Sequence, residues 1–217
     1  MEYKTVLFPS EAEFTEKKSR FIGSLMPVCS WEQAEEEIRK VKSRLKGAKH
    51  YAYAYVLREG NIKRFSDDGE PQGTAGTPML EILERSGLYD VLVVGTRYFG
   101  GILLGVGGLV RAYSQCAKDA VGAAQTVIME PCAEIEFDTD YNMYGGISRI
   151  LPQYEAKILE ENFGSVIKIR VVIREKDYEK FKLELIELSS GRIEPKILKK
   201  MYDFLKKQQE NTKKTSI

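Results

Sequence analysis

The sequence predicts an α+β fold in two domains, and three observations support this prediction. The chain has 217 residues, which suits two domains of about 75–130 residues better than one small domain. Hydrophobic residues make up 43% of it, enough for a core in each domain. Strand and helix patterns alternate throughout, and a composition break near Pro131 separates 1–132 from 133–205. A polar tail, 206–217, follows.

Apolar patterns at the start of the first domain predict strands over 5–8 and 20–28, and a helix after Ser30. Ser30 is followed three residues later by Gln33, which is a capping-box pattern. Apolar residues spaced three and four apart predict one buried stripe on this helix. The stripe consists of Trp31, Ala34, Ile38, Val41 and Leu45.

The remainder of the first domain alternates between strand and helix patterns. Two strands, 50–57 and 61–65, are expected to pair as a hairpin. The breaker-rich loop 66–78 follows, and Thr77 with Pro78 predicts the start of a helix. A buried strand over 90–96 and a second helix from near Gly107 complete the domain.

The strand and helix patterns of the second domain predict the element order β-α-β-β-α-β, which is the ferredoxin-like pattern. Asp177 is expected to cap the second helix and Gly191 to end it. The predicted strands cover 133–138, 156–162, 166–174 and 193–201, and the first helix covers 142–155.

Charge and cysteine content exclude several classes of protein. The chain has 33 basic and 32 acidic residues, a net charge of +1, which argues against a uniformly basic coat but allows a local basic patch. Its three cysteines form no CxxC pair, so we expect neither a disulfide scaffold nor a zinc knuckle. No signal-peptide pattern or run of ~20 apolar residues is present, so we expect a cytoplasmic protein without membrane contact.

The segment from Arg97 to Arg111 is the strongest candidate site. A strand ends, glycines let the backbone turn, and a helix begins whose free N–H groups attract anions. Arg97 and Arg111 can bind phosphate through their guanidinium groups, and Tyr98 and Phe99 can stack on bases. The glycines are Gly100, Gly101, Gly105, Gly107 and Gly108. The segment is neither a Walker A loop nor a GxGxxG motif, and a purely structural turn remains the alternative.

The loop 66–78 and the strand before it supply further candidates. Asp67, Asp68 and Glu70 can hold a hard cation or supply a base, although turn chemistry explains the loop equally well. The candidate residues of this loop also include Gly73 and Thr74. His50 is the only histidine, so it cannot build a multi-histidine metal site. No nucleophile elbow accompanies it, and a binding role suits it better than catalysis.

Four segments together resemble the YigZ/IMPACT family: Lys18-Ser-Arg-Phe21, the His50-Tyr-Ala-Tyr strand, the loop 66–78 and the segment 97–111. The resemblance covers almost the whole N-terminal half. It implies an N-terminal domain similar to the second domain of a small-subunit ribosomal protein, with a left-handed βαβ crossover. It also implies that the C-terminal ferredoxin-like domain is similar to domains of elongation factor G.

The resemblance implies a role in translation. Eukaryotic members compete for the activator of a stress kinase, and bacterial members look like RNA- or ribosome-associated proteins. No catalytic residue set carries over. The first hypothesis is therefore a non-enzymatic regulator, without cofactor or metal, that binds RNA, the ribosome or a protein through Lys17, Lys18, Arg20, Arg97 and Arg111. The alternatives are a Mg²⁺-dependent enzyme acting on a phosphorylated or nucleotide substrate, and a protein–protein adaptor. The oligomeric state stays open.

Overall fold

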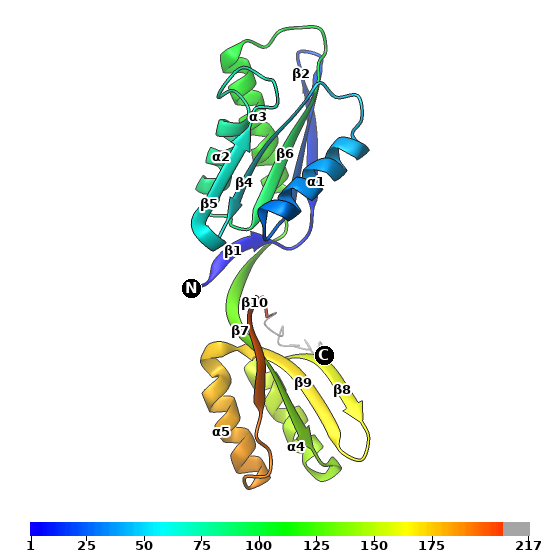
Figure 1. Ribbon diagram of the computed structural model, residues 1–217, viewed down its shortest axis with the longest axis vertical. Helices are drawn as coiled ribbons and strands as arrows, with labels where there is room; N and C mark the ends of the chain where they lie inside the picture. The colour runs from blue at the N-terminus through cyan, green and yellow to red at the C-terminus, as the bar shows by residue number, and fades with distance from the viewer. Residues whose placement is uncertain (206–217) are drawn as a thin grey trace, which may run out of the picture. The chain divides into compact units, whose positions relative to one another are not determined.

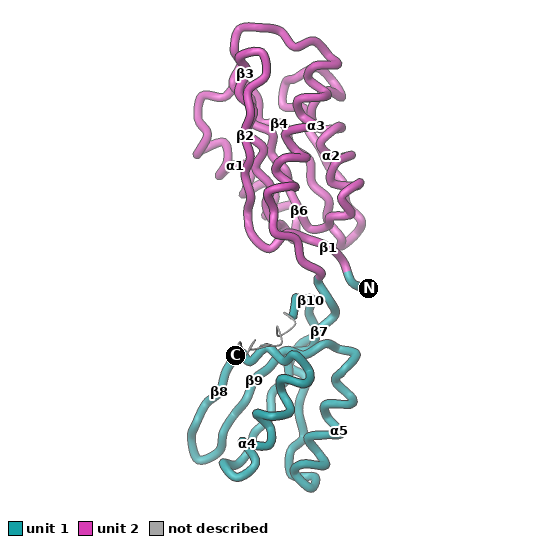
Figure 2. The backbone as a smooth tube through the Cα atoms, turned by 180° about the vertical axis from the view of Figure 1, so that it is seen from behind, with its two compact units in different colours: residues 1–2, 129–217 teal, residues 3–128 magenta. Residues whose placement is uncertain are grey.

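The structure is a computed structural model that describes residues 1–205, and the predicted tail 206–217 lies outside the described residues. Among the described residues, Figure 2 shows two compact units, one of residues 3–128 and one of residues 1–2 with 129–205. Strand β7 (Thr126–Thr139) runs through this division. The composition break at Pro131 therefore lies inside a continuous strand, not in a linker.

The first unit is built on a five-stranded sheet with the strand order β2-β3-β6-β4-β5 (Figure 1). Its neighbouring strands are all antiparallel. The strands are β2 (Ser10–Glu16), β3 (Ser19–Pro27), β4 (His50–Leu57), β5 (Ile62–Ser66) and β6 (Val91–Tyr98). The sequence did not predict β2, because this edge strand buries none of its residues fully.

The helices cover both faces of this sheet. Helix α1 (Trp31–Arg44) packs on one face, whereas α2 (Gly76–Arg85) and α3 (Val106–Gly122) pack on the other. The predicted cap of α1 is present, because Ser30 Oγ accepts a hydrogen bond from Gln33 N at 3.3 Å. The predicted stripe was wrong at Trp31, which is 50% exposed. The helix begins at this residue, and its buried contacts start one turn later.

The strand pairing and the positions of the helices also show that one of the two βαβ crossovers is left-handed. β3 and β4 are parallel, because both are antiparallel to β6, and β5 and β6 are parallel through β4. The connections through α1 and α2 lie on opposite faces. They also run in opposite directions along the sheet and leave strands that point in opposite directions. These three reversals give the two crossovers opposite hands. One is therefore left-handed, as the resemblance implies, although βαβ crossovers are nearly always right-handed.

The second unit has the predicted ferredoxin-like topology. Its strands are ordered β10-β7-β9-β8, all antiparallel. The short strand β1 (Tyr3–Val6), which pairs with β7, belongs to the residues of the first unit. The other elements are α4 (Tyr141–Ile150), β8 (Lys157–Phe163), β9 (Ile167–Arg174), α5 (Tyr178–Ser189) and β10 (Lys196–Asp203). Asp177 stands at the start of α5, but its side chain makes no capping hydrogen bond.

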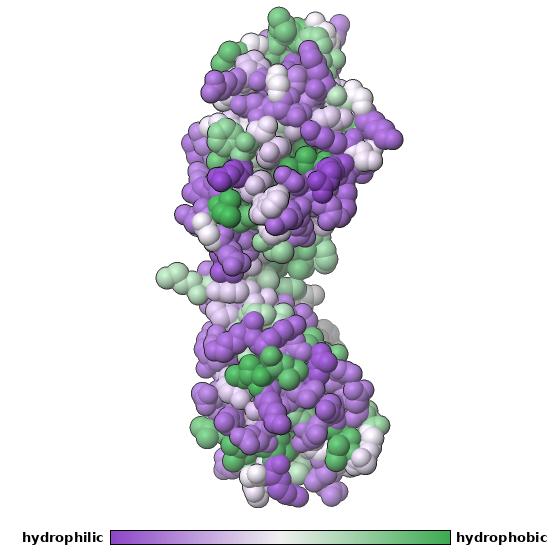
Figure 3. Space-filling model, viewed as in Figure 1, coloured by the Kyte–Doolittle hydropathy of each residue, from purple (hydrophilic) through white to green (hydrophobic). Residues whose placement is uncertain are grey.

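The open face of this second sheet carries charges that neutralise one another. Arg170 and Lys199 both pair with Glu134, and Lys168 pairs with Glu136. The view in Figure 3 is mainly hydrophilic, with small separate hydrophobic patches. The ion pairs of Glu134 and Glu136 leave this sheet face without an excess of positive charge for nucleic acid. Among residues 1–205, no helix is long and apolar enough to cross a bilayer.

Candidate binding site at the glycine-rich loop

The glycine-rich loop, residues 99–105, joins the end of β6 to the start of α3 at the top of Figure 1. A pocket of about 360 Å³ is formed by this loop, the 66–75 loop and the start of β4. Its lining residues are Lys49, His50, Gly69, Glu70, Pro71, Arg97, Phe99, Leu103, Leu104, Gly105, Val106 and Leu109. The structure therefore brings together the two segments that the sequence singled out separately.

A buried ion pair forms the base of this pocket. Arg97 Nη1 donates to both carboxylate oxygens of Glu70, at 2.8 and 3.1 Å, and the two side chains are only 6% and 3% exposed. The Tyr113 hydroxyl donates to the same carboxylate at 2.8 Å. Burial, followed by the nearby Glu70 charge, raises the pKa of Tyr113 far above its usual range. The sequence suggested that Arg97 meets a phosphate, but its guanidinium is enclosed and already paired.

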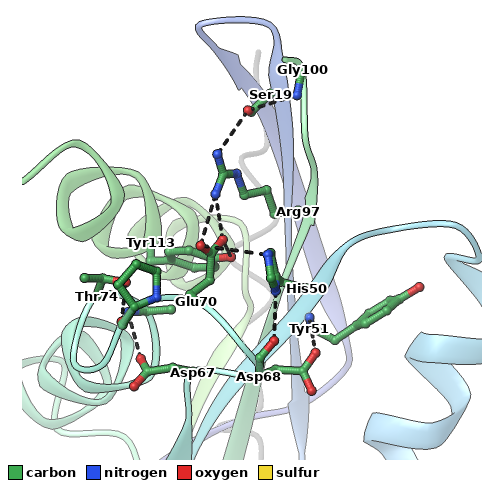
Figure 4. Close-up of polar contacts among 12 residues, drawn as sticks. Ser19, His50, Tyr51, Asp67, Asp68, Glu70, Thr74, Arg97, Gly100 and Tyr113 are labelled. Carbon is green, nitrogen blue, oxygen red and sulfur yellow. Dashed lines mark hydrogen bonds and ion pairs between the residues drawn. The ribbon is translucent and has the colours of Figure 1, made fainter. Parts of the chain in front are cut away.

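His50 lies beside this pair. Its Nδ1 atom makes a hydrogen bond, whereas its Nε2 atom faces Glu70 from a greater distance. Its Nδ1 is 2.9 Å from the backbone oxygen of Asp68, which can only accept, so Nδ1 carries a proton. Its Nε2 lies 4.0 Å from Glu70 Oε2, too far for a direct hydrogen bond. Figure 4 shows these contacts as a chain that runs from Gly100 through Ser19, Arg97, Glu70 and His50 to Asp68.

Asp67 holds the 66–75 loop on the start of α2. Its carboxylate accepts from the backbone N–H groups of Gly73, Ala75 and Gly76, at 2.8 to 3.0 Å. The predicted cap at Thr77 was therefore wrong: α2 begins at Gly76, and Asp67 accepts from the orphan N–H groups of its first turn. Gly73 has φ +75°, a left-handed conformation that suits glycine.

Asp68 and Thr74 complete the attachment of this loop. Asp68 Oδ2 accepts from Tyr51 N at 2.7 Å, and Oδ1 lies 3.2 Å from Lys42 Nζ on α1. The Thr74 hydroxyl is buried and donates to Pro71 O. Asp67, Asp68 and Glu70 thus point to three different sets of partners. Among the described residues, no group of three His, Cys, Asp or Glu side chains is placed to hold a metal ion, so the cation site suggested for this loop is not formed.

A strained turn lies against the glycine-rich loop. Lys17 and Lys18 connect β2 to β3 with φ angles of +44° and +64°, whereas such hairpin turns favour Asn-Gly or Asp-Gly. Gly100 touches this turn so closely that a Cβ there would lie 2.0 Å from the Lys18 carbonyl. The Ser19 hydroxyl accepts from Gly100 N at 3.2 Å and holds the two segments together.

Four cations on the segments that form or adjoin the pocket have no ion-pair partner among the described residues. We call them the basic rim: Lys49 lines the pocket, and Lys17, Lys18 and Arg111 lie on the turn against Gly100 and on α3. All four are exposed. Lys49 Nζ lies 5.2 Å from the Phe99 ring centre. Arg20 differs, because Glu13 neutralises it at 2.6 Å while its guanidinium covers Tyr98.

The start of α3 adds unpaired backbone donors beside the basic rim. Gly105, at φ +73°, is the N-cap residue and has no side chain to cap the helix, and the first turn contains no acidic residue. Gly107 and Arg111 are exposed, and Gly101 has φ +83°. Gly108 packs against Leu104, whose Cβ would be 3.0 Å from a Cβ at Gly108. This helix start is available to an anion.

The loop also exposes large apolar side chains. Phe99 is 41% exposed, Leu103 81% and Val106 64%. Exposed apolar groups next to uncompensated charge are typical of a surface that meets a partner. Sequence reasoning missed Lys49 and Tyr113, which carry no motif of their own. Their roles depend on strand pairing and helix packing.

Two profile matches cover most of the chain. Residues 17–121 match the Impact N-terminal domain, and residues 137–192 match a domain of unknown function, DUF1949. A solved structure described as a hypothetical protein has a TM-score of 0.62 and 32% sequence identity, covering 91% of this chain and 98% of that one.

Named relatives agree with these matches. The chain is 36% identical to the IMPACT family member YvyE of Bacillus subtilis over 88% of each chain. It is 35% identical to YigZ of Escherichia coli over 82% of this chain and 89% of that protein. Protein IMPACT of Rattus norvegicus is 33% identical over 43% of this chain, and the match spans 31% of that protein. The chain belongs to the IMPACT family.

Proposed function

We propose that the chain is a non-enzymatic regulator linked to translation or stress, and that it binds single-stranded RNA, free or on the ribosome, at the glycine-rich loop. The observation that carries this proposal is the basic rim. Lys49 lines the pocket, while Lys17 and Lys18 lie on the turn against Gly100 and Arg111 lies on α3, all without an ion-pair partner among the described residues. Some other cations of the first unit, such as Arg20, Lys42 and Lys63, are paired with acids. Lys46, Arg64 and Lys118 are exposed and, like the basic rim, form no ion pair with a described residue. The net charge of +1 is compatible with a local basic patch.

The groups at this site match the two parts of a nucleotide. The start of α3 and the basic rim suit phosphates, which bind helix N-termini and cations. Phe99 lies among them as an exposed ring on which a base can stack. A single strand fits this combination better than a duplex, because its bases are free to reach the ring.

The conformation of the Lys17–Lys18 turn supports the proposal. A left-handed conformation costs a non-glycine residue about 1–2 kcal/mol, and two successive lysines adopt it here. Strain of this kind is concentrated at functional sites. The turn places two ammonium groups at the tip of one hairpin, whereas an Asn-Gly turn would be less strained but would carry no cation there.

A protein partner is the second candidate. The exposed Ile102, Leu103 and Val106 favour it, because they form an apolar edge next to the basic rim, and an acidic segment with apolar residues would complement both. The Mg²⁺-dependent enzyme has less support, since Asp67, Asp68 and Glu70 already bind separate protein groups.

Salt-dependent binding tests the RNA proposal. Fluorescence anisotropy with a labelled single-stranded RNA octamer would be measured from 50 to 200 mM salt. Four phosphate contacts predict a slope of log K against log salt of about −3. Absence of binding at the lowest salt, or affinity that does not change with salt, would exclude RNA and leave the protein partner.

A further inference from the structure

His50 Nε2 and Glu70 Oε2 face each other inside the pocket. When the ring is uncharged and its Nδ1–H donates to the Asp68 carbonyl, Nε2 presents a lone pair. The Oε2 atom of Glu70 lies 4.0 Å away. Oε1 already accepts from Arg97 and Tyr113, whereas Oε2 accepts only from Arg97, at 3.1 Å.

These acceptors are held rigidly. Glu70 is 3% exposed and is fixed by Arg97 and Tyr113, while His50 is 12% exposed and is fixed through Asp68. A ligand that offers two neighbouring N–H groups can donate to both of these acceptors. A buried acceptor left without a donor disfavours a ligand that lacks them.

The rest of the pocket suits a flat, largely apolar ring. Phe99, Leu103, Val106 and Leu109 supply apolar wall, and the volume of about 360 Å³ lies in the range of small-molecule sites. Lys49 stands at the same wall as the one exposed cation of the lining. It can donate to a carbonyl oxygen on the ligand.

We propose that this pocket binds one unpaired guanine base by its Watson–Crick edge, with His50 Nε2 and Glu70 Oε2 as acceptors and Phe99 as the stacking surface. Guanine presents N1–H and the N2 amino group side by side. The two acceptors lie 4.0 Å apart, which is wider than these donors, so the two hydrogen bonds of about 2.9 Å diverge from the base. The O6 atom then faces donors such as Lys49. Uracil offers a single N–H between two carbonyls, and these carbonyls would face the carboxylate.

This inference rests on the proposed RNA binding, and the test separates the two. The full chain is titrated with an all-uridine octamer, with the same octamer carrying one guanosine, with one inosine, which lacks the amino group, and with free guanosine monophosphate. We expect the guanosine octamer to bind about tenfold more tightly than the uridine octamer, since a good bidentate pair discriminates at this level. The inosine octamer is expected to fall between them.

Variants of His50 link the preference to the pocket. His50→Leu removes the acceptor and is expected to abolish the guanosine preference, whereas His50→Gln keeps an acceptor and is expected to retain part of it. Equal affinity for guanosine and uridine octamers overturns the pocket inference and leaves RNA binding intact. Binding of the free nucleotide without binding of any octamer overturns RNA binding and keeps the pocket. No binding in any arm overturns both.

Discussion

Glu70 and Arg97 form a buried ion pair that joins the 66–75 loop to the end of strand β6, with Arg97 Nη1 2.8 Å from Glu70 Oε1. The pair connects residues that are 27 positions apart in the chain. It places a carboxylate at the base of the pocket and removes Arg97 from the cations available to a ligand.

The pair predicts a large stability effect at Glu70. Glu70→Ala leaves the Arg97 charge buried without a partner, so the free energy of unfolding should fall by about 3–5 kcal/mol. Glu81→Ala is the matched control, because the Glu81–Arg85 pair is 53% and 76% exposed and should change stability by about 0.5 kcal/mol or less. Urea denaturation measures both. Similar effects of the two substitutions would show that the buried pair contributes no more to the free energy of unfolding than the exposed pair.

Asp67 provides a second stability test. Asp67→Ala leaves three backbone N–H groups without their acceptor, and we expect a loss of about 1–3 kcal/mol. Thr77→Ala should have almost no effect, because α2 starts before this residue. Urea denaturation of both variants shows which of the two residues stabilises the start of α2. A larger effect at Thr77 would favour the cap that the sequence suggested.

How far the sequence predicts this molecule depends on whether a pattern is local. Ser30 with Gln33, the alternation of His50–Leu57 and the β-α-β-β-α-β order are local signals, and all three match the structure. Strand β2 was missed because this edge strand alternates only between half-buried and exposed positions and buries no residue fully. The cap of α2 was misplaced because Asp67 reaches it from eight to nine residues away.

The chemistry of the site was harder to predict than its position. The glycines and the 66–78 loop marked the location, but Arg97 looks the same in sequence whether it faces solvent or a buried carboxylate. Its burial follows from the pairing of β6 between β3 and β4 and from the packing of Tyr113 beside Glu70. Such contacts link distant segments, so only the fold reveals them.

We expect relief of strain in the Lys17–Lys18 turn to raise stability and to lower RNA affinity. The double variant Lys17→Asn, Lys18→Gly adopts the left-handed turn with less strain, and we expect stability to rise by about 1 kcal/mol. RNA affinity should fall, since two cations of the basic rim are removed. Thermal unfolding and anisotropy measure the two effects on the same preparation. Unchanged affinity would remove these lysines from the binding surface.

Tyr113 predicts a loss of stability at alkaline pH. Burial and the Glu70 charge hold its pKa above the ordinary value of 10.0, so the unfolded chain releases this proton first. The stabilising contribution is complete below pH 10 and is lost as pH rises further, at up to about 1.4 kcal/mol per pH unit. Tyr113→Phe should reduce this slope, and the exposed control Tyr89→Phe should not. Equal slopes in both variants would contradict the buried position of the hydroxyl.

Paired substitutions on α3 test the proposed RNA binding most directly. Arg111 lies in the basic rim, whereas Lys118 is an equally exposed cation two turns further along the same helix. Salt titrations of the single-stranded octamer would be compared for Arg111→Ala, Lys118→Ala and the unaltered chain. We expect weaker binding and a slope less steep by about 0.7 for Arg111→Ala only. Identical slopes for all three proteins would contradict phosphate binding at the glycine-rich loop.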